Sequence, residues 1–378
     1  MKKERSDNSK VAMSSNTKTK LSKERPMKLI KYIGMDVHKA MTVIAVLDST
    51  GKVLAEAIIQ TKGSTILGFL KSQHGTLHVA FEEGTQAAWL YDLIQPLVAS
   101  VIVCDPRKIV RQGNKGDKVD ARLLAELLRT GGLKPIYHGE KSTRAVKELA
   151  LSYLSVVEDS TRVKNRLKAL FRGRGIECNG TEVYTPEQRK DWLAKLDSPA
   201  VRARADRQWQ ELDLLERLNE EAANDLAAEA RKHAATRILR SVPGIGPVRA
   251  AVILGVAATP HRFRTKKQFW GYCGLGVVTV TSSEYELVNG RVSKSKRRPL
   301  VRGLNYNYNR AMKAVFKGAA KTVAAGVWKS RFEAMVAEGM EESLARVTLA
   351  RKVASITLAI WKKGERYDQR KLKTTHAA

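Results

Sequence analysis

Short apolar segments alternate with amphipathic ones between Leu29 and Arg129, and this order restricts the fold more than any other feature of the chain. Strand-forming residues bounded by turns such as Asp48–Gly51 predict β-strands at residues 32–35, 42–47, 53–59, 77–81 and 100–104. Apolar residues at helical spacing predict helices at residues 64–72, 86–97 and 120–129. Three strands followed by alternating helices and strands are typical of an α/β domain with a mixed sheet.

The pattern becomes helical after Pro135. Apolar residues recur at helical spacing from Ser142 to Phe171, and the charged segment Gln208–His233 is rich in Leu and Ala, as in a long spacer or coiled coil. We therefore expect five parts: a basic tail at 1–27, an α/β domain at 28–140, a helical or coiled-coil connector at 141–235, a mainly α C-terminal domain at 236–330 and a basic helical extension at 331–378.

The net charge of the chain indicates what kind of partner it has. Lys and Arg number 68 against 38 Asp and Glu, which leaves a formal net charge of +30. A charge of this size repels itself in a compact state, so a polyanion is the expected partner. Nucleic acid is favoured over an anionic membrane.

Several classes of protein are excluded. The three cysteines, Cys104, Cys178 and Cys273, are far apart and form no CxxC pair, which argues against a disulfide scaffold or a zinc finger and fits a reducing compartment. The longest apolar run, Ala250–Ala258, falls far short of the roughly 20 residues of a membrane span. The basic N-terminus lacks the apolar region of a secretory signal, so we expect no membrane partner.

Four acidic residues lie where predicted strands end or a helix begins. Asp36 follows the first strand, Glu82 follows the strand at 77–81, and Asp117 and Asp120 come near the start of the helix at 120–129. A separation of three residues puts Asp117 and Asp120 on one helical face. Two divalent metals about 3.5–4 Å apart need more carboxylate oxygens than one segment can supply. The four acids therefore predict a metal site for phosphodiester chemistry.

Each of these acids also has an ordinary interpretation. Asp36 could cap the turn that follows it, and Asp117 and Asp120 could stabilise a helix N-terminus through the helix dipole. Glu82 and Glu83 both follow an apolar strand and are expected to need a partner or a metal. Strand alternation does not choose between these two glutamates, and we favour Glu82 because it lies at the strand end.

Two basic segments are candidates for binding nucleic acid. No acid falls between Arg291 and Lys313, and the intervening Asn305–Asn309 could stack on bases or hydrogen-bond to them. A second group of cations lies on the helix predicted from Ser142. A solvated helix face is the alternative for the segment from Arg291 to Lys313. The cations expected to bind nucleic acid are Arg162, Lys164, Arg166, Lys168, Arg291, Lys294, Lys296, Arg297, Arg298 and Arg302.

Two serines, Ser282 and Ser283, precede the second basic segment. A serine among phosphate-binding cations could attack a phosphodiester, because the cations would stabilise both the alkoxide and the pentavalent transition state. The alternative is a pair of hydroxyls that form hydrogen bonds within a loop.

The segment Pro243–Pro247, with sequence PGIGP, is similar to the turn of a helix–hairpin–helix. The glycines of such a turn let backbone N–H groups approach a phosphate at a helix N-terminus. A plain turn between two helices is the alternative.

Six motifs in this order resemble the transposases of the IS110 insertion-sequence family, over about residues 30–310. The motifs are Gly34–Lys39, Glu82–Gln86, Lys115–Ala121, Asn165–Leu167, Pro243–Pro247 and Gly274–Gly276 with the serines downstream of it. Two details depart from the family pattern. A Thr-Gly pair usually follows the first glutamate, and a glycine usually follows the serine, whereas here Glu83 and Glu284 occupy the neighbouring positions.

The resemblance implies an N-terminal RuvC-like domain of the ribonuclease H type, whose acids Asp36, Glu82, Asp117 and Asp120 hold Mg²⁺ or Mn²⁺. It implies a coiled-coil connection to a C-terminal transposase domain, with Ser282 as the nucleophile and Ser283 as the alternative. Members of the family are recombinases that use a structured guide (bridge) RNA to pair with donor and target DNA.

The resemblance also implies a quaternary state and a location. The acids of one subunit act with the serine of another to form a phosphoserine-linked DNA intermediate, which requires a homo-oligomer, either a dimer or a tetramer. The expected location is the bacterial cytoplasm, in association with the nucleoid.

Two other functions remain open on the sequence. The first is a metal-dependent nuclease of the Holliday-junction type, in which water attacks and no covalent intermediate forms. The second is a non-catalytic scaffold that binds RNA or DNA through the same basic surfaces. A junction nuclease would keep its activity when both serines are mutated, whereas a recombinase would lose it. Neutral substitutions of the four acids would change nothing in a scaffold, whereas they would inactivate an enzyme.

Overall fold

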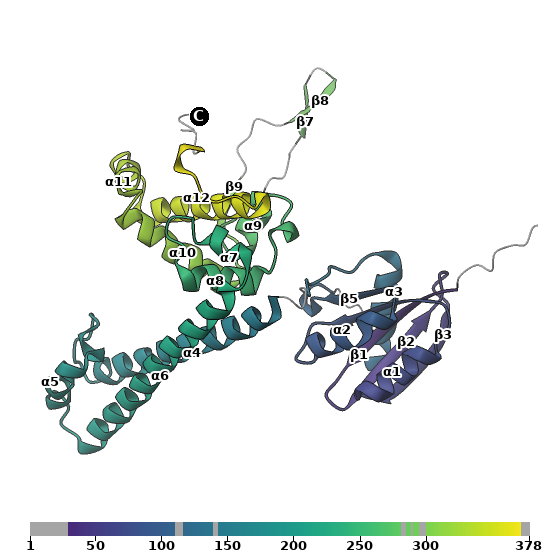
Figure 1. Cartoon of the computed structure of the whole chain (residues 1–378), viewed down its shortest axis with the longest axis horizontal. Helices are drawn as coiled ribbons and strands as arrows, with labels where there is room; N and C mark the ends of the chain where they lie inside the picture. The colour runs from purple at the N-terminus through teal and green to yellow at the C-terminus, as the bar shows by residue number, and fades with distance from the viewer. Residues whose placement is uncertain are drawn as a thin grey trace, which may run out of the picture. The chain divides into compact units, whose positions relative to one another are not determined.

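The computed structural model describes residues 29–109, 116–138, 143–280, 285–288, 290–294 and 300–371. The chain divides after His138 into two compact units, each with its own hydrophobic core (Figure 1). Among the helices of the described residues, none combines the length and the apolar character that crossing a membrane requires.

The first unit contains a five-stranded mixed sheet in the order β3-β2-β1-β4-β5. Its strands are β1 (Ile30–Val37), β2 (Met41–Leu47), β3 (Val53–Gln60), β4 (Thr76–Glu82) and β5 (Ser100–Cys104). β1 pairs antiparallel with β2 and parallel with β4, and β4 pairs parallel with β5. The predicted α/β domain with a mixed sheet is therefore confirmed, and the carboxyl ends of β1 and β4 lie side by side.

Helices cover both faces of this sheet (Figure 1). On one face, α1 (Gly63–Ser72) and α2 (Ala87–Ile94), which continues into the short 3₁₀ turn Gln95–Leu97, pack on Met35 and Phe81. On the opposite face lies α3 (Asp117–Thr130). Another 3₁₀ turn, Pro106–Lys108, follows β5. The alternation of side chains along β1 and β4 assigns their apolar residues to these two layers.

A row of small residues lets α3 lie close to the sheet. Gly34 lies opposite Ala45 on β2 and Ala80 on β4 in the strand register, and all three are buried under α3. The helix presents Ala121 and Ala125 to this row. A Cβ atom on Gly34 would lie 2.0 Å from the carbonyl oxygen of Ala121, closer than real contacts allow. The position of α3, and of the acids in its first turn, therefore depends on the absence of a side chain at residue 34.

The second unit is mainly helical, as expected. Its two longest helices, α4 (Arg144–Arg172) and α6 (Pro199–Arg231), pack against each other and run antiparallel, since Lys164 pairs with Glu216 and Arg166 with Glu211. At the far end of this pair, α5 (Arg189–Ala194) and the 3₁₀ turns Glu182–Tyr184 and Pro186–Gln188 close a small core around Phe171, Trp192 and Trp209.

The remaining helices of the second unit share one larger core (Figure 1). They are α7 (Ala234–Leu239), α8 (Pro247–Ala257), α9 (Lys266–Tyr272), α10 (Arg310–Ala325), α11 (Lys329–Ala337) and α12 (Glu342–Lys363), with 3₁₀ turns at Pro260–Arg262 and Gln369–Lys371. Two pairs of antiparallel strands belong to the same unit: β6 (Val277–Val280) with β9 (Leu300–Leu304), and β7 (Tyr285–Val288) with β8 (Arg291–Lys294). The division of this unit at residues 235 and 330 stays a prediction.

The close packing of α3 generates a stability prediction. Gly34→Ala should lower the free energy of unfolding by about 1–3 kcal/mol, because the atoms that the new methyl group meets belong to the α3 backbone and cannot rotate away. Chemical denaturation of the purified protein measures the change.

Gly68→Ala is the matched control. Gly68 lies in the interior of α1, where an added methyl group would meet nothing within 4 Å, so alanine should leave stability unchanged or raise it by up to about 1 kcal/mol. Equal effects of the two substitutions would contradict the role assigned to Gly34.

Candidate active site

Asp36 lies near the carboxyl end of β1, on the face of the sheet that α3 covers. It follows Met35, which points to the opposite face and is fully buried in the core under α1 and α2. Asp36 thus points to the same side as Gly34, two residues before it. Its side chain is only 17% exposed, which is low for a carboxylate.

Asp117 and His38 complete a compact group with Asp36. The His38 Nε2 atom lies 3.2 Å from Asp36 Oδ2, to which it donates a hydrogen bond, and 3.7 Å from Asp117 Oδ1. Among the described residues, these three side chains form a group that offers ligand atoms within 4.8 Å of one another. Asp117 is the first residue of α3 and is 62% exposed, so the group is open to solvent.

The sequence predicted Asp36 and Asp117 but assigned no role to His38. The residue follows Asp36 at a spacing of two, just past the end of β1. At that spacing the side chains of an extended chain share a face, and this signal could have included His38 in the predicted set.

The electrostatics of the group centre on Asp36. Partial burial raises the pKa of the Asp36 carboxyl, the imidazole of His38 opposes this effect, and the negative charges of Asp117 and Asp120 raise the pKa further. Asp120 is one turn along α3 from Asp117. A raised pKa means that ionised Asp36 is held at a cost that a bound cation would remove.

The two glutamates at the end of β4 differ in their surroundings. Glu83 is engaged elsewhere, since His138 Nε2 donates a hydrogen bond to its Oε2 at 2.8 Å and the His138 ring stacks on Tyr91. Phe81 lies opposite Met35 in the register of β4 and β1. The next residues along the two strands, Glu82 and Asp36, therefore have their side chains on the same face of the sheet. Glu82 also borders a cavity of about 400 Å³ together with Lys39. Strand alternation therefore places Glu82, and not Glu83, on the face of the sheet that carries Asp36.

The donor set fits a divalent cation. Carboxylate oxygens are the ligands that Mg²⁺ and Mn²⁺ prefer, and imidazole suits softer first-row metals as well. Asp36 and Asp117 supply such oxygens at the distances given above, with Asp120 one turn away and Glu82 at the neighbouring strand end. A cation bound here would also offset the repulsion among the acids.

The predicted cations of α4 are engaged within the chain. Arg162 pairs with Asp159 on the same helix, and the pairs of Lys164 and Arg166 with acids of α6 are described above. Lys168 donates to the backbone oxygen of Asn179 at 3.1 Å. These contacts join α4 to its neighbours, which reduces the charge that the helix offers to a polyanion.

The second basic segment is only partly described. Arg291 is exposed at the start of β8, Lys294 lies in β8 and Arg302 lies in β9. The residues that lie outside the described ranges are Ser282, Ser283, Lys296, Arg297 and Arg298.

Tyr306 and Tyr308, both predicted to contact bases, differ in accessibility. Tyr306 is 92% exposed. The ring of Tyr308 packs over Gly274 and lies 4.1 Å from Lys313 Nζ, measured to the ring centroid. Tyr306 therefore offers a free ring, whereas Tyr308 is part of the packing.

The glycines of the PGIGP turn have two different surroundings. Gly244 has a positive φ of 80°, and a Cβ atom there would lie 2.7 Å from the carbonyl oxygen of Ala319 on α10. Gly246, the N-cap of α8, has nothing within 4 Å of a Cβ position. The first glycine thus serves the packing of the turn on α10, and the second leaves the α8 N-terminus open.

The electrostatics of Asp36 generate a prediction. In the absence of divalent metal, Asp36→Asn should raise the melting temperature at neutral pH, because the folded state raises the pKa of Asp36 and so holds its charge at a cost. This cost is present above the raised pKa and disappears below about pH 4, so the variant's advantage should vanish there. Thermal unfolding in EDTA at pH 7.5 and pH 4 measures both effects.

Asp48→Asn is the control of opposite sign. The hydroxyl of Thr50 lowers the pKa of Asp48, so its charge is favourable in the folded state. No gain in stability is expected from this substitution. A neutral-pH gain for Asp48→Asn and none for Asp36→Asn would contradict the electrostatics assigned to the site.

Comparison with protein families identifies two matching regions. Residues 33–174 match a family profile named for the DEDD transposases of IS110 and described as a transposase. Residues 236–332 match the profile of the transposase IS116/IS110/IS902 family. Together the two profiles cover more than half of the chain.

Individual relatives belong to the same group. The transposase for insertion sequence element IS1533 of Leptospira borgpetersenii is 32% identical over 179 residues, which cover 45% of this chain and 51% of that protein. The putative transposase y4qE of Sinorhizobium fredii is 25% identical, with 65% and 62% covered. The mini-circle putative transposase for IS117 of Streptomyces coelicolor is 24% identical, with 71% and 81% covered.

The matched part spans between about half and two thirds of the length of the first two relatives. The first profile covers the α/β unit and continues through α4 of the second unit, and the second profile lies within the helical unit. The chain belongs to the IS110 family of transposases.

Proposed function

We propose that this protein is an insertion-sequence transposase that cuts and rejoins DNA at a divalent-metal site made by Asp36, Glu82, Asp117 and Asp120. The observation that carries the proposal is the grouping of the ligand atoms of Asp36, His38 and Asp117 within 4.8 Å, where the end of β1 meets the start of α3. The net charge of +30 supports a nucleic-acid substrate, and the family profile over residues 33–174 supports a DEDD site.

Each residue of the site has a distinct part. Asp36 and Glu82 come from adjacent strand ends and form the fixed side of the site, and His38 orients Asp36 through its hydrogen bond. Asp117 and Asp120, from the first turn of α3, form the exposed side that faces an arriving DNA strand. Mg²⁺ or Mn²⁺ held by these acids would polarise the scissile phosphate and lower the pKa of the attacking hydroxyl.

The finer part of the proposal concerns the nucleophile. Ser282, with Ser283 as the alternative, attacks phosphorus through Oγ. The P–Oγ bond forms, the P–O bond to one deoxyribose breaks, and the leaving deoxyribose oxygen takes up the proton. Rejoining reverses these steps with a hydroxyl from another strand. Arg291 and the cations that follow it in the sequence would stabilise the charge on the phosphate.

The proposal includes partners. Donor and target DNA would pair with a structured guide RNA, and two or more copies of the chain would assemble so that the acids of one act with the serine of another. Family membership and the excess of cations support this arrangement. The bacterial cytoplasm, at the nucleoid, would be the place of action.

The metal-site proposal predicts a selective loss of cleavage. Asp36→Asn should reduce strand cleavage by more than about 100-fold while leaving DNA binding nearly intact, because the acid acts on the reacting phosphate rather than on the backbone contacts. Cleavage of labelled donor DNA, measured beside an electrophoretic binding assay, separates the two effects.

Two glutamine variants provide the matched control. Glu82→Gln should lose cleavage to a similar extent as Asp36→Asn, whereas Glu83→Gln should keep most of it, because Glu83 is paired with His138. Normal cleavage by Asp36→Asn would refute the metal-site assignment and favour the non-catalytic scaffold. The reverse result for the two glutamates would move the site to Glu83.

The serine proposal predicts a covalent adduct. Wild-type protein incubated with its element RNA, donor and target DNA and Mg²⁺ should give a protein–DNA species that protease removes, visible on a denaturing gel. The double variant Ser282→Ala, Ser283→Ala should give none. Cleavage that persists in this variant without any adduct would favour the metal-dependent junction nuclease.

A further inference from the structure

Helix α12 carries a lysine in an unusual environment. Lys352 is only partly exposed, and burial lowers the pKa of its ammonium group. Within the described ranges, no carboxylate lies within 4.0 Å of Lys352. Burial of a cation without a nearby counter-ion costs free energy, because the loss of hydration is not repaid.

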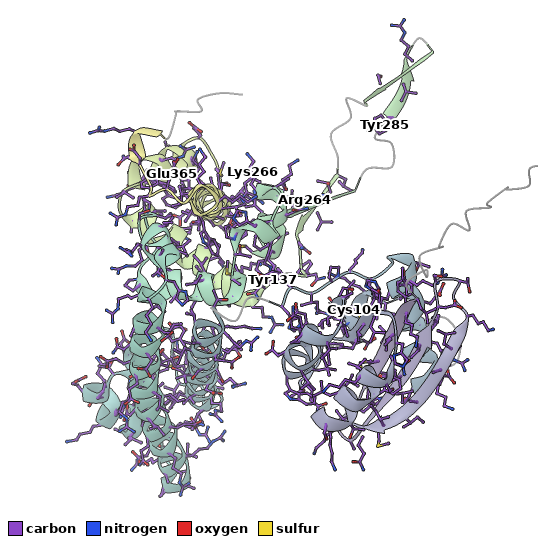
Figure 2. The ribbon with its side chains drawn as sticks, turned by 45° about the vertical axis from the view of Figure 1, so that its right-hand side comes forward. Cys104, Tyr137, Arg264, Lys266, Tyr285 and Glu365 are labelled. Carbon is purple, nitrogen blue, oxygen red and sulfur yellow. The ribbon has the colours of Figure 1, made fainter. Side chains whose placement is uncertain are left out.

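Two further cations face Lys352 from other helices. After burial, the charges of Arg331 on α11 and Lys266 on α9 are the next causes that lower the pKa of Lys352. α9 is held on α12 by Trp270, whose Nε1 atom donates to the backbone oxygen of Arg351 and to Ser355 Oγ, each at 3.1 Å. Lys266, the first residue of α9, is labelled in Figure 2, and its Nζ atom lies 5.8 Å from the centroid of the same Trp270 ring. Helices α9 and α11, which both pack on α12, thus each place one cation where its charge acts on Lys352.

Two other cations, one on α11 and one on α12, are neutralised by acids of the same helix. On α12, Arg346 pairs with Glu342 at 2.5 Å, and on α11, Lys329 lies 3.7 Å from Glu333. Arg331 is two residues after Lys329 and has no such partner among the described acids. Lys266, Arg331 and Lys352 differ from these two cations in having no carboxylate within 4.0 Å among the described residues.

We propose that Lys266, Arg331 and Lys352 form a site for the phosphodiester backbone of a nucleic acid. A backbone phosphate supplies the anion that the described residues do not, and its binding relieves the repulsion among the three cations. None of the three belongs to the cations expected from the sequence. They lie on three different helices and are far apart along the chain, so the sequence gives no sign that they come together. The inference rests on the proposed function in one respect, which is that the polyanion bound by this protein is a nucleic acid.

The test compares two double variants with equal loss of charge on the same two helices. Arg331→Gln, Lys352→Gln removes two cations of the site, and Lys329→Gln, Arg346→Gln removes two ion-paired cations. Binding to a random-sequence duplex DNA and to a single-stranded RNA of equal length is measured by fluorescence anisotropy over a series of KCl concentrations in EDTA. Thermal unfolding confirms that both variants are folded.

The site variant should reduce the slope of log K against log salt by about 1–2 and weaken binding roughly tenfold or more at 0.1 M salt. The ion-paired control should change the slope by much less. A loss with duplex DNA alone, with RNA alone or with both supports the site and identifies which backbone it holds.

Equal losses for the two double variants would overturn the inference, because total charge would then explain the effect. No loss for either would also overturn it, because the three cations would then not contribute to binding. Failure of the wild-type protein to bind any nucleic acid would instead contradict the proposed function. The assay needs neither metal nor cleavage, so the two failures are distinguishable.

Discussion

The contact between α3 and β1 at Gly34 is the constraint on which the candidate site depends. Helix and strand approach so closely that no side chain fits between them at Gly34. The neighbouring residues on the flanking strands, Ala45 and Ala80, also have small side chains and so leave room for the helix. This contact fixes the first turn of α3 at the end of β1. Asp117 and Asp36, 81 positions apart in the chain, are thereby brought within reach of one cation.

Each unit contains a group of like charges that the surrounding side chains do not fully neutralise. The group is acidic in the first unit and basic in the second. In the first, burial and neighbouring acids raise the pKa of Asp36, and His38 compensates only in part. In the second, Lys352 and its neighbours lack a counter-ion among the described residues, whereas most cations of α4 that the sequence singled out are paired with acids. Such arrangements cost stability unless a ligand supplies the missing charge. A divalent cation suits the first and a phosphate backbone suits the second.

Much of this arrangement could be predicted from local sequence. Alternation and turn residues predicted all five strands of the mixed sheet, and the positions of Asp36 and Asp117 at element ends followed from them. What could not be predicted depends on contacts distant in sequence. The ion pair of Arg166 is with a residue on α6, Glu83 is paired with His138, and the proposed site at Lys352 requires three helices to meet.

Anomalous diffraction from crystals soaked in Mn²⁺ would show whether the acids of β1 and α3 hold a metal, because it locates the ion without any assay of activity. We expect an anomalous peak at about 2.2 Å from carboxylate oxygens of both Asp36 and Asp117. The peak should be missing from crystals of Asp36→Asn soaked in the same way. A fully soaked wild-type crystal with no peak between β1 and α3, or with its peak at acids elsewhere, would contradict the metal-site assignment.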